Sequence, residues 1–348
     1  MGRYYLAVSC RDFEQSFTDK PFMNKKRKDT IKKVVSWSLT GLAVLFMGWY
    51  IYKNRDILNL LRTLHVGDII LIAILQPINI IIGGVINKLI IDSIDQKIKL
   101  SDSLMLQFAN NFVNRFIAQG GAVYRSAYLK TQFDFPISKF LASIGGVYII
   151  NLMANATIGI FLVIFFYLTA NIFNIYMLGL FLALLFGMIT LLLIKPKFQS
   201  ERWFFKKLTQ VVNGWYQIKG DRILIIKMFG LSAISLINAS LIVFIAYRAL
   251  DVDIQFMNSF FYSTISSLSN IINLTPGGLG INEAILMFSS DVIGVSSEVI
   301  LLGSLMLRAI SMITTFSIGG ISYMILNYRL QKTGKSREAT VEEEEELF

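Results

Sequence analysis

Residues 275–284 read Thr-Pro-Gly-Gly-Leu-Gly-Ile-Asn-Glu-Ala, and they interrupt an apolar stretch that runs from residue 256 to residue 290. Proline has no backbone N–H to donate and glycine supports a helix poorly, so a continuous helix through these positions is not expected. The stretch therefore predicts two short helices joined by a break. The residues of this break are Pro276, Gly277, Gly278 and Gly280.

A second break is expected within residues 104–130, where the glycine pair Gly120 and Gly121 divides another apolar stretch. In each stretch, asparagine precedes the glycine pair and a charged residue follows it. Non-helical backbone at membrane depth is tolerated only where protein or water satisfies its polar groups. If both breaks lie in a membrane, each stretch is expected to form a re-entrant helical hairpin.

The composition of the whole chain places these breaks in a membrane. Of its 348 residues, 54% are hydrophobic and only 16% are charged, whereas soluble domains carry about a quarter charged residues. A spanning helix needs roughly 20 mostly apolar residues. Six such runs are predicted, at residues 34–52, 69–86, 139–168, 176–194, 223–247 and 299–327.

The order span, hairpin, span occurs twice, at residues 69–168 and 223–327. The flanking spans of the two units run in opposite senses, which is typical of an inverted repeat. The predicted fold is an all-α polytopic membrane protein with six spanning helices and two re-entrant hairpins, in one domain over residues 34–327. The halves are joined by residues 169–222, in which a basic amphipathic segment at 198–218 is expected to lie on the membrane surface.

Lys and Arg in short loops are retained on the cytoplasmic side, so they predict the orientation. If the N-terminus is cytoplasmic, the inner segments carry 20 basic residues and the outer segments carry 4. The protein is therefore expected in the cytoplasmic (inner) membrane with both termini inside. Residues 1–33 would be a cytoplasmic segment. Residues 328–348, which contain a run of glutamates at positions 342–346, would be a solvated acidic tail.

Four charged residues are predicted at membrane depth, where a charge costs roughly 2.5–3.5 kcal/mol on insertion scales. They are Arg115, Arg125, Glu283 and Arg308. One interpretation is a purely structural ion pair of Glu283 with Arg308 or with Arg115. The other is that the arginines bind a phosphate, which guanidinium matches in geometry, while Glu283 receives a cationic headgroup or pairs with an arginine between transport steps.

Asparagines are numerous in the same regions, and they also permit two interpretations. Each could cap a half-helix, and together they could form a polar pathway for a lipid headgroup. The asparagines assigned to a candidate headgroup site are Asn114, Asn151, Asn273 and Asn282.

Other chemistries find little support in the sequence. One cysteine and one histidine exclude a disulfide framework and multi-histidine metal centres. The net charge of +10 does not sit on a long polar domain that could bind nucleic acid. No phosphate-binding loop of the Gly-x-x-x-x-Gly-Lys-Ser/Thr type is present. We therefore predict no metal, no cofactor, no nucleic-acid partner and no direct use of ATP.

The stretch at residues 275–284 resembles the signature of the lysylphosphatidylglycerol synthase membrane region, also called the flippase-like domain family. Residues 114–121, Asn-Arg-Phe-Ile-Ala-Gln-Gly-Gly, look like its companion signature, with Gln119 where proline is frequent. The resemblance covers roughly residues 30–330. It implies lipid movement across the bilayer, in some members of aminoacylated phosphatidylglycerol made by an attached soluble synthase. Only 21 residues follow Asn327, too few for that synthase.

Three functions remain open at this stage. The leading hypothesis is a flippase or scramblase for a phospholipid, such as aminoacylated phosphatidylglycerol or a glycolipid. The second is the membrane part of a phosphatidylglycerol lysyltransferase system, which would need a soluble partner enzyme because no catalytic residues are found in this chain. The third is a scaffold for lipid-modifying enzymes. The lipid headgroup and the oligomeric state do not follow from the sequence.

Overall fold

The computed structural model describes residues 52, 64–93, 97–117, 120–135, 137–170, 174–193, 216, 219–269 and 280–332, and those residues form helices and short connections without a strand. The predicted span 34–52, apart from Tyr52, lies outside them. So do residues 1–33, the amphipathic segment 198–218 apart from Tyr216, and the tail beyond residue 332. The orientation in the membrane stays a prediction.

Four segments are long and apolar enough to cross a membrane: Val66–Asp92, Ile144–Thr169, Arg222–Ala249 and Ser297–Lys332. They lie in α3 (Val66–Asp92), α6 (Ile137–Ala170), α9 (Arg222–Ala249) and α13 (Ser297–Thr314) with its continuation. They coincide with four of the six predicted spans, and the protein is therefore a multi-pass helical membrane protein. The predicted span 176–194 corresponds to α7 (Ile175–Leu193), whose apolar segment is shorter.

The last long helix changes its hydrogen-bonding pattern partway along. After α13, residues Thr315–Gly319 form the π-helical segment η4, and the helix then continues to Lys332. A π-helical turn accommodates an extra residue and is a recognised cause of helix bending. The π-helical segment ends at Gly319, next to Gly320.

The two broken stretches form pairs of shorter helices. The first consists of α4 (Leu100–Phe116) and α5 (Gly120–Phe133), and the second of α10 (Phe256–Ser269) and α11 (Ile281–Phe288), followed by α12 (Ser290–Ile293). The longest of these helices has 17 residues, or about 26 Å at 1.5 Å per residue. Each is therefore shorter than the hydrocarbon core of about 30 Å.

The first break differs in detail from the expectation. Helix α4 ends at Phe116 and Ile117 has an extended backbone, so Gly120 and Gly121 form the start of α5 instead of the break itself. A Cβ atom on Gly121 would overlap the backbone carbonyl of Asn110. The glycine therefore permits close approach of the two arms. In the second stretch, Pro276, Gly277 and Gly278 lie outside the described residues.

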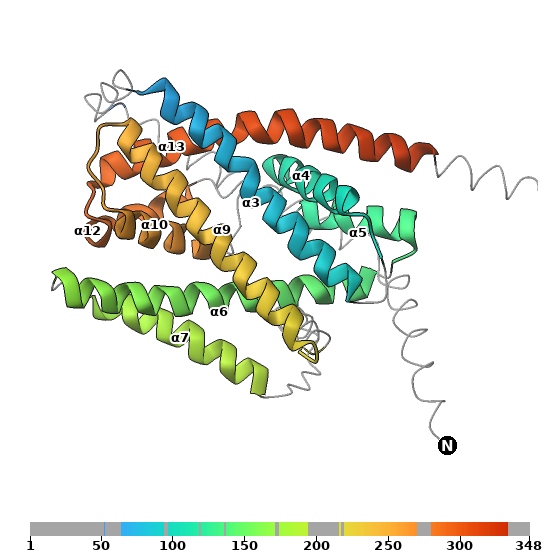
Figure 1. Cartoon of the computed structure of the whole chain (residues 1–348), viewed down its shortest axis with the longest axis horizontal. Coiled ribbons are helices and arrows are strands. Elements are labelled where there is room, and N and C mark those ends of the chain that lie inside the picture. Colours follow the sequence, from blue (N-terminus) through green and yellow to red (C-terminus); the bar gives the residue numbers. More distant parts are fainter. Residues whose placement is uncertain are drawn as a thin grey trace, which may run out of the picture.

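The helices pack in corresponding pairs. Helices α3 and α9 lie along each other (Figure 1), α4 packs on α3, and α10 packs on α9. Helix α5 packs on α6, and α11 packs on α13. Across the molecule, α4 contacts η4 of the last span, while α10 contacts α6. Helix α7 packs on α6 alongside this arrangement (Figure 1).

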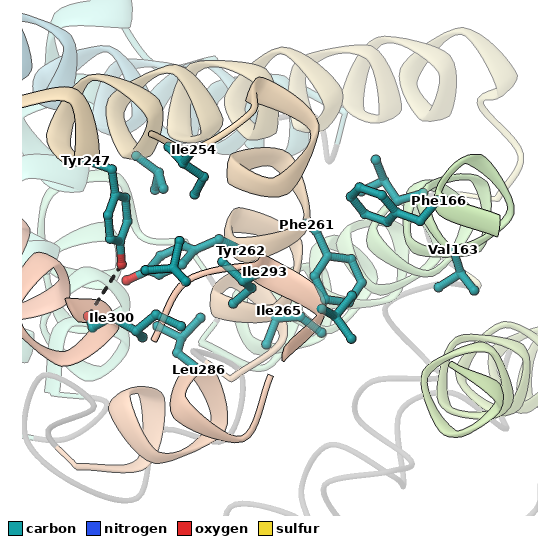
Figure 2. Close-up of a cluster of buried hydrophobic side chains, with 14 of the residues drawn as sticks. Val163, Phe166, Tyr247, Ile254, Phe261, Tyr262, Ile265, Leu286, Ile293 and Ile300 are labelled. Atoms are coloured by element: carbon teal, nitrogen blue, oxygen red, sulfur yellow. Dashed lines mark hydrogen bonds between the residues drawn. The ribbon is translucent and has the colours of Figure 1, made fainter. Parts of the chain in front are cut away.

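The largest hydrophobic cluster joins α6 and α7 to the second half of the chain. Figure 2 shows Phe166 of α6 beside Phe261 of α10, and Tyr247 of α9 beside Tyr262 and Ile300. Tyr247 is fully buried and lies over Gly303, where any side chain would collide with its ring. This packing holds α10, α11 and α13 together, and so positions the charged residues that α11 and α13 carry.

Candidate functional site

A polar cavity lies where the long helices meet the hairpin helices. Its volume is about 490 Å³, within the range of about 300–1,000 Å³ usual for ligand sites. Residues of α3, α4, α6, α9, α10, α11 and α13 line it. Its polar lining comprises Gln76, Asn79, Arg115, Asn151, Asn155, Ser232, Ser235, Tyr262, Ser263, Ser266, Ser267, Asn282, Glu283, Ser304, Arg308 and Ser311.

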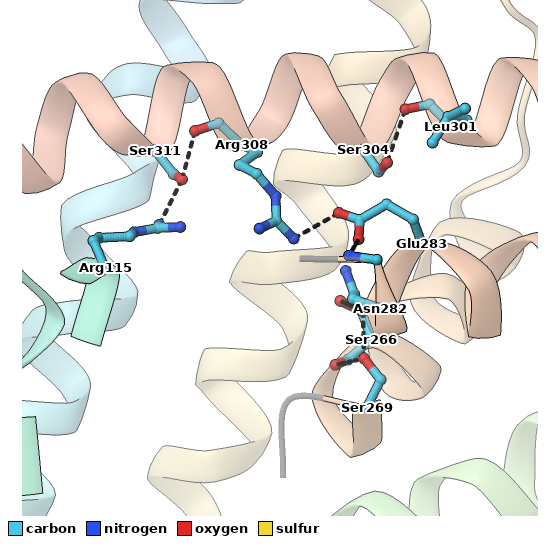
Figure 3. A network of polar contacts seen from close by, with 10 residues as sticks. Arg115, Ser266, Ser269, Asn282, Glu283, Leu301, Ser304, Arg308 and Ser311 are labelled. Atoms are coloured by element: carbon cyan, nitrogen blue, oxygen red, sulfur yellow. Dashed lines mark hydrogen bonds and ion pairs between the residues drawn. The ribbon is translucent and has the colours of Figure 1, made fainter. Parts of the chain in front are cut away.

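An ion pair forms one wall of this cavity. Arg308 of α13 donates from Nη2 to Glu283 Oε1 of α11 at 2.6 Å (Figure 3). The Glu283 side chain is only 3% exposed and the Arg308 side chain 11%. Of the two pairings left open by the sequence, the structure contains Glu283 with Arg308. At this burial each charge depends on the other to offset its desolvation.

The Glu283 side chain also caps the start of α11 (Ile281–Phe288). Its second carboxylate oxygen, Oε2, accepts the backbone N–H of Gly280 at 2.8 Å, at the start of α11. Gly280 has φ of 85°, a left-handed conformation in which glycine avoids the steric cost of a side chain. The two carboxylate oxygens therefore have different partners within the protein, one the Arg308 guanidinium and the other a backbone amide.

Arg115 reaches the same cavity from the first hairpin. Its Nη2 donates to the Ser311 hydroxyl at 2.8 Å, and that hydroxyl donates to the Arg308 carbonyl at 2.9 Å (Figure 3). Among the described residues, no carboxylate forms an ion pair with Arg115. One hydroxyl satisfies only part of the five N–H donors of a guanidinium. Arg115 thus brings an uncompensated positive charge to the cavity wall.

Arg125 lies elsewhere. It donates from Nη1 to Gln107 Oε1 at 3.0 Å, and its guanidinium carbon is 5.5 Å from the ring centre of Phe140. It does not line the cavity. The structure thus brings Arg115, Glu283 and Arg308 together but leaves Arg125 between α4, α5 and α6.

The predicted asparagines divide between the two roles considered for them. Asn114 is outside the cavity lining, and its Oδ1 accepts the backbone N–H of Gly121 at 2.8 Å, as a cap does. Asn151 and Asn282 line the cavity. Asn151 Oδ1 accepts from the Ser232 hydroxyl at 2.6 Å, and Asn282 Oδ1 accepts from Ser266 and Ser269 (Figure 3). Asn273 lies outside the described residues.

Two buried polar atoms of the lining have no hydrogen-bond partner within the described part of the chain. They are Oδ1 of Asn155 on α6 and Oγ of Ser263 on α10. Asn155 is 6% exposed and Ser263 is 4% exposed. Leaving such a group buried and unpaired costs about 1–3 kcal/mol.

Sequence reasoning missed the serines of the lining. Ser232 and Ser235 are three residues apart on α9, and Ser304 and Ser311 are seven apart on α13. Both spacings repeat one face of a helix. A polar stripe on an otherwise apolar span was therefore the signal that could have found them. Within the described residues, no cluster of three or more His, Cys, Asp or Glu side chains could hold a metal ion.

Fold and cavity together define a class: a multi-pass helical membrane protein with arginines and a buried carboxylate facing a polar chamber. The chain matches the family model of the lysylphosphatidylglycerol synthase TM region over residues 34–319 and belongs to that family. The family links the chain to lysylphosphatidylglycerol synthesis and translocation. No curated protein and no solved structure matches it.

Proposed function

We propose that this protein is a flippase or scramblase that moves phospholipids across the cytoplasmic membrane, holding the headgroup in the polar cavity while the acyl chains stay in the bilayer. The observation that carries the proposal is Arg115, a guanidinium on the wall of a membrane-embedded cavity whose acceptor is a serine hydroxyl. Such a charge is expensive in a membrane and marks a substrate pathway in the usual case. A lipid phosphate supplies the missing negative charge.

The transport domain in this proposal is residues 34–327, built as an inverted repeat of residues 69–168 and 223–327. Helix contacts support it, because exchanging α3 with α9, α4 with α10, α5 with α11 and α6 with α13 reproduces the pattern of packing. The lengths of α4, α5, α10 and α11 support two re-entrant hairpins. Inverted repeats of this kind place substrate sites at the interface of the halves near the midplane, and helices of both halves contribute to the cavity lining.

In this site, Arg115 binds the phosphate, and the pair of Glu283 with Arg308 fixes the cavity wall and adds a second guanidinium. Asn151 and Asn282 offer hydrogen bonds to the headgroup. Asn114 and Gly120 with Gly121 shape the first hairpin, and Gly280 the second. Asn273 and the glycines at 277 and 278 lie outside the described residues, and their place in the site stays a prediction. Arg125 acts indirectly, by holding α5 on α4 and α6.

The test is reconstitution of the chain into phosphatidylcholine vesicles that contain acyl-labelled fluorescent phosphatidylglycerol. A membrane-impermeant quencher reports how fast inner-leaflet lipid reaches the outside. We expect protein-dependent exchange in the unaltered chain and a drop of about tenfold in Arg115→Gln, equivalent to the loss of one charged hydrogen bond. Arg115→Gln is preferred to a change at Glu283 because it strands no buried partner.

Arg222→Gln is the matched control. Arg222 is exposed at the start of α9 and lies outside the cavity lining. Both variants should elute as single species by size-exclusion chromatography. Equal exchange rates in Arg115→Gln and the unaltered chain would remove Arg115 from the site, and vesicles with no protein-dependent exchange at all would overturn the transport function.

A second candidate is that the chain forms the membrane part of a phosphatidylglycerol lysyltransferase system and acts with a soluble synthase. The family membership favours it, since the family description names a synthase. Lysyl transfer to phosphatidylglycerol by the purified chain, supplied with charged tRNA, would support this function. Transfer that requires an added soluble synthase would place the chain as its membrane partner, and a scaffold role predicts neither transfer nor exchange.

A further inference from the structure

We infer that the cavity selects phosphodiester lipids whose headgroups carry neutral hydroxyls, such as glycerol or a sugar, and disfavours headgroups that carry an ammonium. The inference rests on the proposed function and specifies its substrate class. It is argued from the charge balance of the cavity, from the partners of its carboxylate and from the neutral amides and hydroxyls of its lining.

The charges of the lining favour one added negative charge. The described residues around the cavity include two guanidinium groups, Arg115 and Arg308, and a single carboxylate, Glu283. Residues 270–279, which join α10 to α11, contain no charged residue in the sequence. The net charge of the described lining is therefore +1, and one phosphodiester neutralises it. A lysyl group, which adds two ammonium charges, would leave the occupied site at +2.

Both oxygens of the Glu283 carboxylate already accept hydrogen bonds from the protein. Glu283 Oε1 accepts from Arg308 at 2.6 Å and Oε2 accepts from Gly280 N at 2.8 Å. A ligand ammonium that bound to Glu283 would compete with both of these hydrogen bonds. No other acidic side chain among the described lining residues can receive it. Because charge interactions strengthen as the dielectric constant falls, this mismatch matters more in a membrane cavity than at a water-exposed surface.

The remaining polar lining is neutral and suits hydroxyl groups. Amides and hydroxyls predominate, contributed by α3, α6, α9 and α10. Amide and hydroxyl groups both donate and accept hydrogen bonds, so they can pair with the hydroxyls of a headgroup without any change in the charge of the site.

The experiment compares four acyl-labelled lipids, each in phosphatidylcholine vesicles with the unaltered chain: phosphatidylglycerol, phosphatidylinositol, phosphatidylethanolamine and lysylphosphatidylglycerol. We expect the two hydroxyl-bearing anionic lipids to exchange at least about tenfold faster than the two ammonium-bearing lipids. Lysylphosphatidylglycerol or phosphatidylethanolamine moving as fast as phosphatidylglycerol would overturn the inference and leave the transport function standing. Failure of all four lipids to exchange would instead overturn the proposed function.

A charge change inside the cavity tests the mechanism of selection. Asn151→Asp keeps the oxygen that accepts from Ser232 and lowers the net charge of the lining from +1 to 0. We expect the ratio of lysylphosphatidylglycerol to phosphatidylglycerol exchange to rise about tenfold. Asn327→Asp is the control, because Asn327 lies on α13's continuation outside the cavity and likewise accepts, from Tyr124 at 3.3 Å. An unchanged ratio in Asn151→Asp would show that selection does not depend on cavity charge.

Discussion

In both helical hairpins a side chain accepts the backbone N–H of a glycine, but the kind of side chain differs. Near the start of its second arm, each has a glycine whose N–H is bound by a side chain at 2.8 Å. In the first hairpin the acceptor is the neutral amide of Asn114, and in the second it is the carboxylate of Glu283. A buried carboxylate requires a counter-charge, and Arg308 supplies it. The amide requires none.

This difference between the caps explains why Arg308 pairs with a carboxylate and Arg115 pairs with a hydroxyl. Arg308 is engaged by Glu283, whereas Arg115 has a serine hydroxyl as its partner. The chain thus combines one structurally committed guanidinium with one that an anionic ligand can engage. The comparison teaches that the capping residue of a helical hairpin decides how much uncompensated positive charge the described residues bring to the adjacent cavity.

The largest effect is expected from breaking the charged cap. Glu283→Gln should lower the free energy of unfolding by about 3 kcal/mol, because it leaves Arg308 buried without its carboxylate. Thermal unfolding of the purified protein in detergent measures this loss. The double variant Glu283→Gln with Arg308→Met should recover most of it, since it removes both charges. A double variant as unstable as the single one would contradict this account of the pair.

The next effect concerns the close approach of the arms in the first hairpin. Gly121→Ala should destabilise the protein by about 1–3 kcal/mol, the usual cost of overpacking, because its Cβ would overlap the Asn110 carbonyl. Gly187→Ala on α7 is the control, since nothing lies within 4 Å of a Cβ at that position. Equal unfolding temperatures for the two variants would show that α4 and α5 are not held at this distance.

A smaller loss is expected from removing the neutral cap. Asn114→Ala should cost about 1 kcal/mol, the typical value for a capping side chain, which is less than the loss at Glu283. The same thermal unfolding measurement applies. A loss at Asn114 equal to that at Glu283 would mean that the two caps carry the same weight, and that charge is not what distinguishes the hairpins.

The smallest effect is expected at the acceptor of Arg115. Ser311→Ala should change stability by less than about 1 kcal/mol, because water can replace the hydroxyl in an open polar cavity. A loss above 2 kcal/mol would indicate that Arg115 is a structural residue, and would weaken its assignment as the substrate-binding arginine.

Much of the fold could be predicted because membrane-spanning helices require long apolar runs, which are easily recognised in a sequence. Apolar runs of about 20 residues are directly visible, and the helices that contain four of them are long and apolar enough to span. The exact end of α4 was not predictable from glycine alone. Gly120 and Gly121 were interpreted as a break, but their structural use is the contact of α5 with Asn110, which depends on tertiary packing.

The part of the candidate site that was predictable is its charged residues and two of its asparagines, Asn151 and Asn282. Glu283, Arg308 and Arg115 stood out because charges are rare at membrane depth, and all three line the cavity. Arg125 stood out for the same reason, yet it packs against Gln107 and Phe140 outside the lining. The serines gave a weaker signal, a polar stripe at helical spacing, because a hydroxyl in a membrane helix often bonds the carbonyl one turn back, as Ser240 does with Leu236 at 2.7 Å.

The buried ion pair has a consequence for biogenesis. Glu283 and Arg308 are only 25 residues apart, whereas Arg115 and Ser311 are 196 apart. Contacts between nearby residues form early because they close short loops. The pair can therefore neutralise itself while the C-terminal helices are entering the bilayer, which lowers the cost of inserting both charges. The contact of Arg115 must wait for the last helix, so the polar chamber is completed only when the whole domain has been synthesised.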